Sequence, residues 1–246
     1  MTVAEIQAAA ARPAVPLIPG GFRPTHRFPE ESWIGRVTAF AAGEGVPTDV
    51  NGKQMMPLAQ VFLPSMACVP RALTGLQLLT FWLSPDYREL LRIHDGIKPF
   101  PNTGAYYQVR EYADLGGLEY HDVPTTDNYL RAFPLRIGEV RSDYPIWDGG
   151  GLSRELEDAV LELEDRGEIE SYYDIIDHEY GHKVGGYPSF CQSGILDSNT
   201  GFGEGFEFVL QISSDEKIGL NVIDNGSLMF ARHAATRQWR LYFDFY

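Results

Sequence analysis

Two histidines and a glutamate occur at the spacing of a zinc-protease signature. His178, Glu179 and His182 form the pattern H-E-x-x-H inside the stretch DIIDHEYGHKVGGYP. On a helix, histidines four residues apart project from one face and can both bind Zn²⁺, while the glutamate activates the metal-bound water. The stretch therefore raises the hypothesis of a zinc-dependent hydrolase, which requires a helix and a third protein ligand.

The neighbouring residues do not favour that helix. Gly181 lies between the two histidines, where a glycine costs about 1 kcal/mol relative to alanine. Gly185 and Gly186 follow within one turn, and Pro188 stands where the extended signature requires a third histidine. We therefore expect no metal and no cofactor, and we keep zinc binding by the two histidines as an alternative.

Other catalytic signatures are missing from the sequence. There is no G-x-S-x-G nucleophile elbow, and NGKQ (Asn51–Gln54) lacks the glycines and the Ser or Thr of a phosphate loop. WDGGG (Trp147–Gly151) follows no clear strand, as a dinucleotide-binding loop would. We do not expect an enzyme, although the zinc hypothesis leaves the question open.

Composition and charge restrict the class of partner. The chain has 246 residues, of which 44% are hydrophobic and 22% charged, and its net charge is −14. Such an excess of negative charge repels phosphate backbones and anionic membranes, so we expect neither nucleic-acid nor membrane binding. The two cysteines, Cys68 and Cys191, form no disulfide framework or metal spacing. The first residues lack a basic leader, and we expect a cytoplasmic protein.

The chain divides into a lead-in and one domain. Thr2 and Glu5 have the spacing of a capping box that opens a short helix within a lead-in over residues 1–30. The stretches VPLIPGGFRP and AAGEGVPTDVNG, up to about Gly52, are typical of loops. One domain follows over residues 31–246, with sheet-rich halves at 31–145 and 180–246 joined by a helix over 152–167.

Apolar runs and alternating patterns predict several strands in this domain. Trp239, Leu241, Phe243 and Phe245 alternate with more polar residues, which is typical of a strand with one buried face. The fold class is therefore α+β, mainly antiparallel sheet with a few helices. Leu and Gln recur at similar places in PLAQVFLP and FVLQISSDE, which leaves two related halves open. The expected strands are Met56–Pro64, Leu76–Ser84, Phe206–Ser213, Gly219–Ile223, Ser227–His233 and Trp239–Tyr246.

The helix over residues 152–167 is amphipathic and acidic. Ser153 is its expected N-cap, Gly167 its expected end, and its apolar residues fall on one face. The opposite face is either a solvated surface or a docking surface for a cationic partner. The residues that we expect to contact such a partner are Glu157, Asp158, Glu162 and Glu164 of the helix, with Tyr172 and Tyr173 as exposed aromatic residues beyond it.

Several short motifs, in order, resemble the YwqG-like family, a bacterial family named as a domain of unknown function. They are GHKVGGYPSFCQ (Gly181–Gln192), FEFVLQISSDEKIGL (Phe206–Leu220) and DNGSLMF (Asp224–Phe230), preceded by SWIGR (Ser32–Arg36) and MPLAQVFLP. The resemblance runs from about Trp33 to Tyr246. It departs from the family at GLNVIDNG, which lacks the tryptophan often found before the Asp-x-Gly turn.

The resemblance implies a fold, a set of motif residues and a context. It implies mainly antiparallel sheet, and a structural role for His182 in pinning a loop. Related proteins are encoded beside toxin systems, and some resemble immunity proteins that neutralise a cognate toxin. The motif residues that match are His182, Gly185, Gly186, Tyr187, Pro188, Gln211, Asp224 and Gly226.

We therefore expect a non-catalytic cytoplasmic binding protein, an immunity protein that neutralises a basic bacterial toxin by direct contact. An acidic inhibitor suits a basic toxin because opposite fields accelerate encounter. The first alternative is a housekeeping small-ligand-binding or regulatory domain, with an apolar pocket bordered by His182 and Tyr187. The second alternative is the zinc-dependent hydrolase. The sequence does not name the toxin, the ligand or the oligomeric state.

Overall fold

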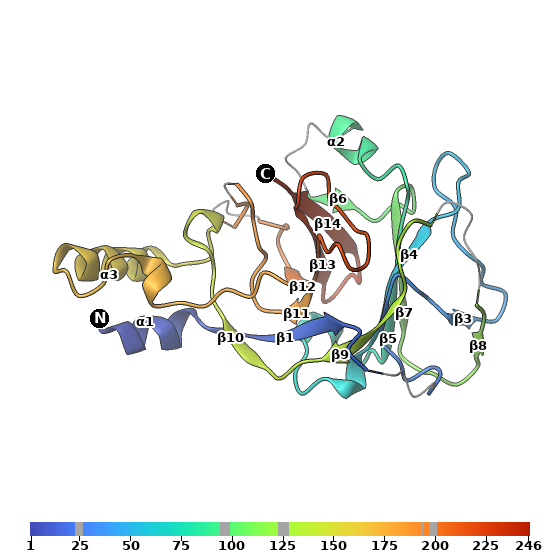
Figure 1. The fold of residues 1–246 in the computed structure, drawn as a ribbon, viewed down its shortest axis with the longest axis horizontal. Helices are drawn as coiled ribbons and strands as arrows, with labels where there is room; N and C mark the ends of the chain where they lie inside the picture. Colours follow the sequence, from blue (N-terminus) through green and yellow to red (C-terminus); the bar gives the residue numbers. More distant parts are fainter. Residues whose placement is uncertain (23–26, 94–98, 123–127, 193, 197–200) are drawn as a thin grey trace.

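The computed structural model describes residues 1–22, 27–93, 99–122, 128–192, 194–196 and 201–246. The described residues form one large curled sheet with its connections, and two helices project from one side of it (Figure 1). Within the described ranges, no helix combines the length and the hydrophobicity that crossing a membrane requires. The helices are α1 (Val3–Ala10), α2 (Glu89–Ile93) and α3 (Arg154–Asp165), and short 3-10 turns occur at Leu63–Ser65, Arg71–Leu73, Trp147–Gly149 and Tyr172–Asp174.

The large sheet has twelve strands in its described part and is antiparallel throughout. Its order is β6-β14-β13-β12-β11-β1-β9-β2-β4-β5-β7, with β10 also paired to β1. A separate two-stranded sheet joins β3 to β8. The strands are β1 (Arg12–Pro19), β2 (Trp33–Ile34), β3 (Ala39–Ala41), β4 (Met56–Phe62), β5 (Leu78–Leu83), β6 (Phe100–Pro101), β7 (Tyr107–Tyr112), β8 (Leu118–Tyr120), β9 (Phe133–Ile137), β10 (Arg141–Asp143), β11 (Lys183–Gly185), β12 (Phe206–Ser213), β13 (Ser227–His233) and β14 (Trp239–Asp244).

The sheet consists of two wings that follow the chain in order. We call β2-β4-β5-β7 the first wing and β11-β12-β13-β14 the second wing; β9 and β1 pair with each other between them. Side chains from both wings share one core, in which Phe81 of β5 packs against Phe230 of β13 at 5.0 Å between ring centroids. Burial of this apolar surface against both wings is the main stabilising contribution to the sheet. The fold is thus mainly antiparallel sheet with few helices, as expected.

Five of the six expected strands are confirmed, as β4, β5, β12, β13 and β14, and the structure adds strands that were not predicted, among them β1, β2, β7 and β9. Residues 12–19 fall in the predicted loop region but form β1. Pro13 and Pro16 lack only the backbone N–H donor, and their carbonyl oxygens can still pair in a sheet. They accept from Gly186 N and Gly138 N, at 2.9 and 2.8 Å respectively. The predicted strand Gly219–Ile223 is instead a tight connection with one bridge, since Gly219 and Ile223 have φ of 77° and 59°.

The helices α1 and α3 form an arm. The predicted capping box is present at α1, where Thr2 and Glu5 exchange hydrogen bonds, and the predicted N-cap Ser153 accepts from Leu156 N at 3.3 Å. α1 and α3 pack against each other in a small core of their own, and Figure 1 shows them beside the sheet, at the left. We call α1, α3 and residues 166–176 the arm.

Two buried glutamines occupy matching places in the two wings. Gln60 lies in β4, next to β2, and its side chain binds Thr38 N, Ala39 N and Glu31 O, on both sides of β2. Gln211 lies in β12, next to β11, and its side chain binds groups on both sides of β11. Each short strand is therefore fixed by a glutamine from the following long strand.

Gly186 should tolerate no side chain. Its φ is 70°, and a Cβ would lie 2.1 Å from Asp143 Oδ2, so Gly186→Ala would displace a buried carboxylate. We expect the free energy of unfolding to fall by about 3 kcal/mol, from left-handed backbone strain and a weakened charged hydrogen bond. Gly43→Ala is the control, since Gly43 has φ of 81° and no described atom lies within 4 Å of its Cβ position; it should cost about 1 kcal/mol. Equal losses in urea-induced unfolding would contradict the assigned packing.

Candidate functional site

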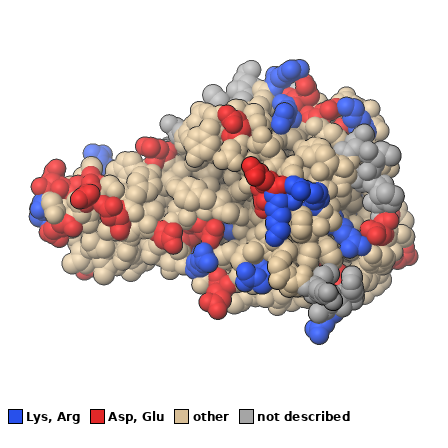
Figure 2. All heavy atoms as spheres, in the orientation of Figure 1, with Lys and Arg blue, Asp and Glu red and all other residues tan. Residues whose placement is uncertain are grey.

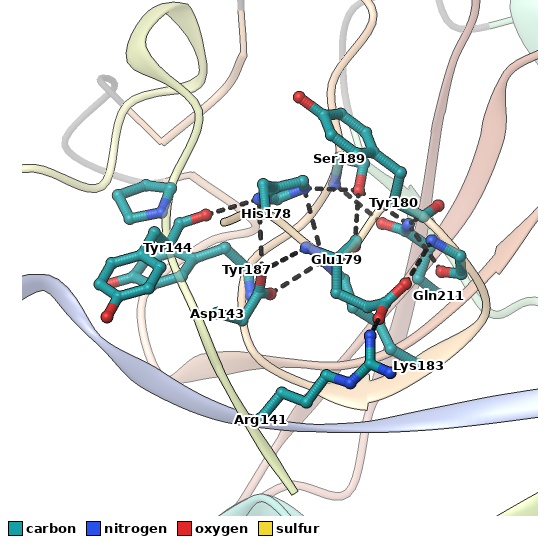
Figure 3. Close-up of polar contacts among 12 residues, drawn as sticks. Arg141, Asp143, Tyr144, His178, Glu179, Tyr180, Lys183, Tyr187, Ser189 and Gln211 are labelled. Atoms are coloured by element: carbon teal, nitrogen blue, oxygen red, sulfur yellow. Dashed lines mark hydrogen bonds and ion pairs between the residues drawn. The ribbon is translucent and has the colours of Figure 1, made fainter. Parts of the chain in front are cut away.

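The H-E-x-x-H residues do not lie on a helix. His178 and Glu179 lie in an irregular segment after the turn Tyr172–Asp174 (Figure 3). His182 directly precedes β11. The glycine-rich sequence favours this extended course, and β11 then pairs with β1 and β12. The two imidazoles consequently do not share a helical face, which the zinc-protease geometry requires.

His178 is held in one tautomer by its neighbours. Its Nδ1 lies 2.5 Å from Tyr144 O, and because a carbonyl oxygen only accepts, Nδ1 carries the proton. Its Nε2 is therefore an acceptor, and it lies 2.7 Å from Ser189 Oγ and 3.4 Å from Lys183 Nζ. Burial and the Lys183 charge lower the pKa of His178 to about 4, so the ring is neutral at pH 7.

Lys183 and Asp143 form an ion pair in which both side chains are fully buried. Lys183 Nζ donates to Asp143 Oδ2 at 2.9 Å and also to Glu179 O. The same carboxylate accepts from Glu179 N and from Tyr187 N, each at 2.8 Å. Burial lowers the pKa of Lys183, and the Asp143 charge opposes this shift. Through these three hydrogen bonds Asp143 connects β10 to β11 and to the residues on both sides of it.

Gln211 completes the buried network, as Figure 3 shows. Its Oε1 accepts from Ser189 N at 2.8 Å, and its Nε2 lies 2.8 Å from Ser189 Oγ. The same Nε2 is also within hydrogen-bond distance of Tyr180 O, Gly181 O and Ser213 Oγ. The segment before β11 is therefore bound to the segment after it through one side chain.

His182 is held by protein partners at both ring nitrogens. Its Nδ1 accepts from Ser213 N at 3.0 Å, so Nε2 carries the proton and faces Asp215 Oδ2 at 3.3 Å. This hydrogen bond is the main reason why the pKa of Asp215 is lowered. Both nitrogens of His182 thus have protein partners, as do both nitrogens of His178. Nowhere in the described residues do three His, Cys, Asp or Glu side chains come together as a metal would require.

Ser189, His178 and Asp143 lie in the order of a catalytic triad, but the arrangement does not present a nucleophile. Ser189 is 4% exposed, and His178 Nδ1 lies 3.4 Å from Asp143 Oδ1 while donating to Tyr144 O instead. The backbone N–H of Ser189 is also committed to Gln211, so it cannot stabilise an oxyanion. The hydrogen bonds of this cluster fix the segments before and after β11.

The remaining motif residues support the same region. Tyr187 is buried, and its hydroxyl donates to Ala10 O at 2.9 Å, which joins the motif to the end of α1. Gly185 and Pro188 line a hollow of about 690 Å³. Asp224 and Gly226 lie in the turn before β13, and Asp224 O accepts from Tyr246 N.

The predicted contact residues lie on the arm, but they are not equally available. Acidic side chains gather at the outer end of the arm in Figure 2. Asp158 and Glu162 are exposed, whereas Glu157 and Glu164 are half-buried. Glu164 accepts from Tyr172 N at 3.0 Å and so stabilises the turn that follows the helix.

The expectation that both tyrosines are exposed is wrong for Tyr172. This residue is 2% exposed, because its ring packs in the small core of the arm and its hydroxyl donates to Pro145 O. Tyr173 is 48% exposed. Sequence reasoning also missed Leu161, which is 47% exposed among the acidic residues of α3. Leu161 does not fall on the apolar face of the helix in the sequence pattern, and this position could have indicated that it is exposed.

A family model described as "Domain of unknown function (DUF1963)" matches residues 32–235. The match includes the network around β11, most of both wings and the acidic helix. No curated protein matches the chain.

Removing Lys183 should leave a buried carboxylate without its counter-charge. We expect Lys183→Met to lower the free energy of unfolding by about 3–5 kcal/mol, measured by urea denaturation. Lys53→Met is the matched control, since Lys53 pairs with Asp86 at 2.7 Å but both side chains are partly exposed; it should cost less than about 1 kcal/mol. The ion pair has no such role if both variants lose the same stability.

His178 should make stability depend on pH between its folded and unfolded pKa values. Its folded pKa of about 4 lies below the ordinary 6.5, so the unfolded chain binds more protons, and stability falls as the pH is lowered through this window. Between pH 7 and 5, the wild type should lose about 2 kcal/mol more than His178→Gln. If the free energies of unfolding of the two proteins, measured in urea, fall in parallel as the pH is lowered, the pKa of His178 is not lowered in the folded state.

Proposed function

The chain belongs to the DUF1963 family, and we propose that it is a non-catalytic binding protein whose arm docks a basic protein partner. The observation that carries this proposal is a stripe on the outer face of α3. Asp158, Leu161, Glu162 and Asp165 follow one another at helical spacing and are all exposed. The buried residues of α3, which include Leu156 and Val160, face the opposite side.

The stripe combines the two features of a protein-docking surface. Leu161 offers an apolar contact in the middle, and the carboxylates around it provide charge complementarity to a cationic surface. Within this stripe, Glu162 lies 3.8 Å from Arg166, while the other carboxylates have no ion pair among the described residues. A basic partner would therefore meet acidic groups that few cations of the chain neutralise.

The arm also presents this stripe favourably. It lies beside the sheet rather than over it, so a partner can approach α3 from several sides (Figures 1 and 2). Its own small core fixes the helix, since Gln7 Nε2 donates to Ile175 O at 2.6 Å and Ile6 packs with the apolar face. Little conformational entropy remains to be lost on binding, which favours affinity.

The more specific form of this proposal is an immunity protein that neutralises a cognate bacterial toxin in the cytoplasm. The YwqG-like resemblance supports it, because some relatives resemble immunity proteins. The net charge of −14 also supports it, since toxins that act on nucleic acids or nucleotides carry basic surfaces. Direct contact would suffice, and no catalytic group would be needed.

We also propose that the two wings are related halves. Gln60 and Gln211 make matching contacts in corresponding strands. Gly35 and Gly185 end the short strands at φ of 70° and 77°, each against a backbone carbonyl. Such agreement supports a duplication beyond the short Leu and Gln echo in the sequence.

Charge reversal of the stripe should separate docking from a merely solvated surface. Asp158→Lys, Glu162→Lys and Asp165→Lys are combined in one variant, and Glu30→Lys, Glu139→Lys and Glu204→Lys in an equally charged control; all six residues are exposed. The partner is isolated by affinity capture from the native host, and its association rate is measured at low salt. We expect the stripe variant to associate at least about tenfold more slowly and the control to match the wild type.

Two results would contradict the proposal at different levels. Equal capture by the stripe variant and the wild type would exclude the arm as the docking surface. The immunity hypothesis requires in addition that the captured protein slows growth when expressed alone, and that co-expression of the wild type restores growth. A captured protein without toxicity would exclude immunity but leave docking intact.

A further inference from the structure

A hollow among the described residues lies beside the family motif and away from the acidic stripe. Its volume is about 690 Å³, a size that suits a small organic molecule. One wall is the backbone of Gly185 and Gly186, and Pro188 continues it.

Two arginines give this hollow a positive character, which is unusual in so acidic a chain. Arg12 and Arg71 both line it, and neither forms an ion pair with a described residue. The Arg12 guanidinium lies 4.2 Å from the centroid of the Tyr187 ring. This stacking fixes Arg12 through one face and leaves its N–H edge able to donate to a ligand.

The acidic residue of the hollow is already engaged. The Glu207 carboxylate accepts from Arg71 N at 3.3 Å and from Ala72 N at 2.7 Å, so backbone donors satisfy both of its oxygens. These bonds also position Arg71 at the rim without using its guanidinium. Glu207 keeps its negative charge, but the hollow is lined by two arginines and this one carboxylate, so positive charge is in excess.

The rest of the lining is apolar. Val69 and Pro70 lie on the side of Arg71, and Phe202 and Phe208 lie on the side of β12. A ligand that fits must therefore pair an anionic head with an apolar body. A free inorganic anion would leave the apolar wall uncovered, and a neutral hydrocarbon would leave both guanidinium groups without a partner.

We propose that this hollow, the motif cleft, binds a small amphipathic organic anion with a carboxylate or phosphate head. Arg12 and Arg71 hold the head, and Val69, Pro70 and Phe202 contact the body. The inference is independent of the proposed docking role, because the stripe on α3 contributes no residue to the cleft.

Three probes separate the parts of this recognition. Octanoate carries head and body, acetate carries the head alone, and octanamide carries the body with a neutral head. In titrations of the full chain followed by ligand-observed NMR, we expect octanoate to bind at least about tenfold more tightly than either of the others. Octyl phosphate tests the second head group, and binding of either anion supports the proposal.

Substitutions then place the bound probe. Arg12→Ala and Arg71→Ala should each weaken octanoate binding about tenfold, which corresponds to one charged hydrogen-bonded contact. Arg154→Ala is the control, since Arg154 is exposed on α3 and does not line the cleft. The stripe variant should bind octanoate like the wild type, even if docking fails. Circular dichroism checks that each variant is folded.

Several outcomes would overturn the proposal. They are the failure of both octanoate and octyl phosphate to bind, equal affinity for octanoate and octanamide, and binding that neither arginine substitution weakens. The first would show that the cleft holds no such ligand, the second that the arginines do not recognise charge, and the third that the probe binds elsewhere.

Discussion

The buried ion pair between Lys183 and Asp143 is the constraint on which the second wing depends. Removing two charges from water costs several kcal/mol per ion, and close geometry with full hydrogen bonding is needed to offset this cost. Asp143 meets the condition by accepting from Lys183, Glu179 N and Tyr187 N. In doing so it ties β10 to the segments before and after β11. The left-handed glycine that follows β11 exists because the carboxylate occupies the space a side chain would need.

The two wings hold their short strands in the same way, but the residues around the shared glutamine differ. A buried glutamine holds a short strand on both sides in each wing, at Gln60 and at Gln211. The first wing places Trp33 in its short strand, whereas the second places Lys183 there. A lysine at a buried position requires a carboxylate, and the polar network with His178 and Ser189 is built around that requirement. The burial of Lys183 thus gives a physical reason for the concentration of polar groups near β11.

The sequence predicted the parts of the fold that depend on local patterns. Apolar runs located β12 and β13, an alternating pattern located β14, and capping residues located the starts of α1 and α3. It missed β1, because prolines signal loops although their carbonyls still pair in a sheet. Tyr172 was expected on the surface because the residues of α1 that help to bury it lie far away in the chain, and no local pattern shows that contact. The pairing of Lys183 with Asp143, forty positions apart, left no local signal either.

The acidic arm and the basic cleft have opposite charge, yet they are separate in structure. Charges on exposed groups are screened over about 8 Å at physiological ionic strength, so neither surface neutralises the other over longer distances. The arm and the cleft are connected by a short stretch of chain and by one packed side chain. Arg12 lies two residues beyond the end of α1, and Tyr187 donates to Ala10 O while stacking under Arg12. Any influence of a cleft ligand on the arm would therefore pass through this junction, where the first strand leaves the helix and meets the motif.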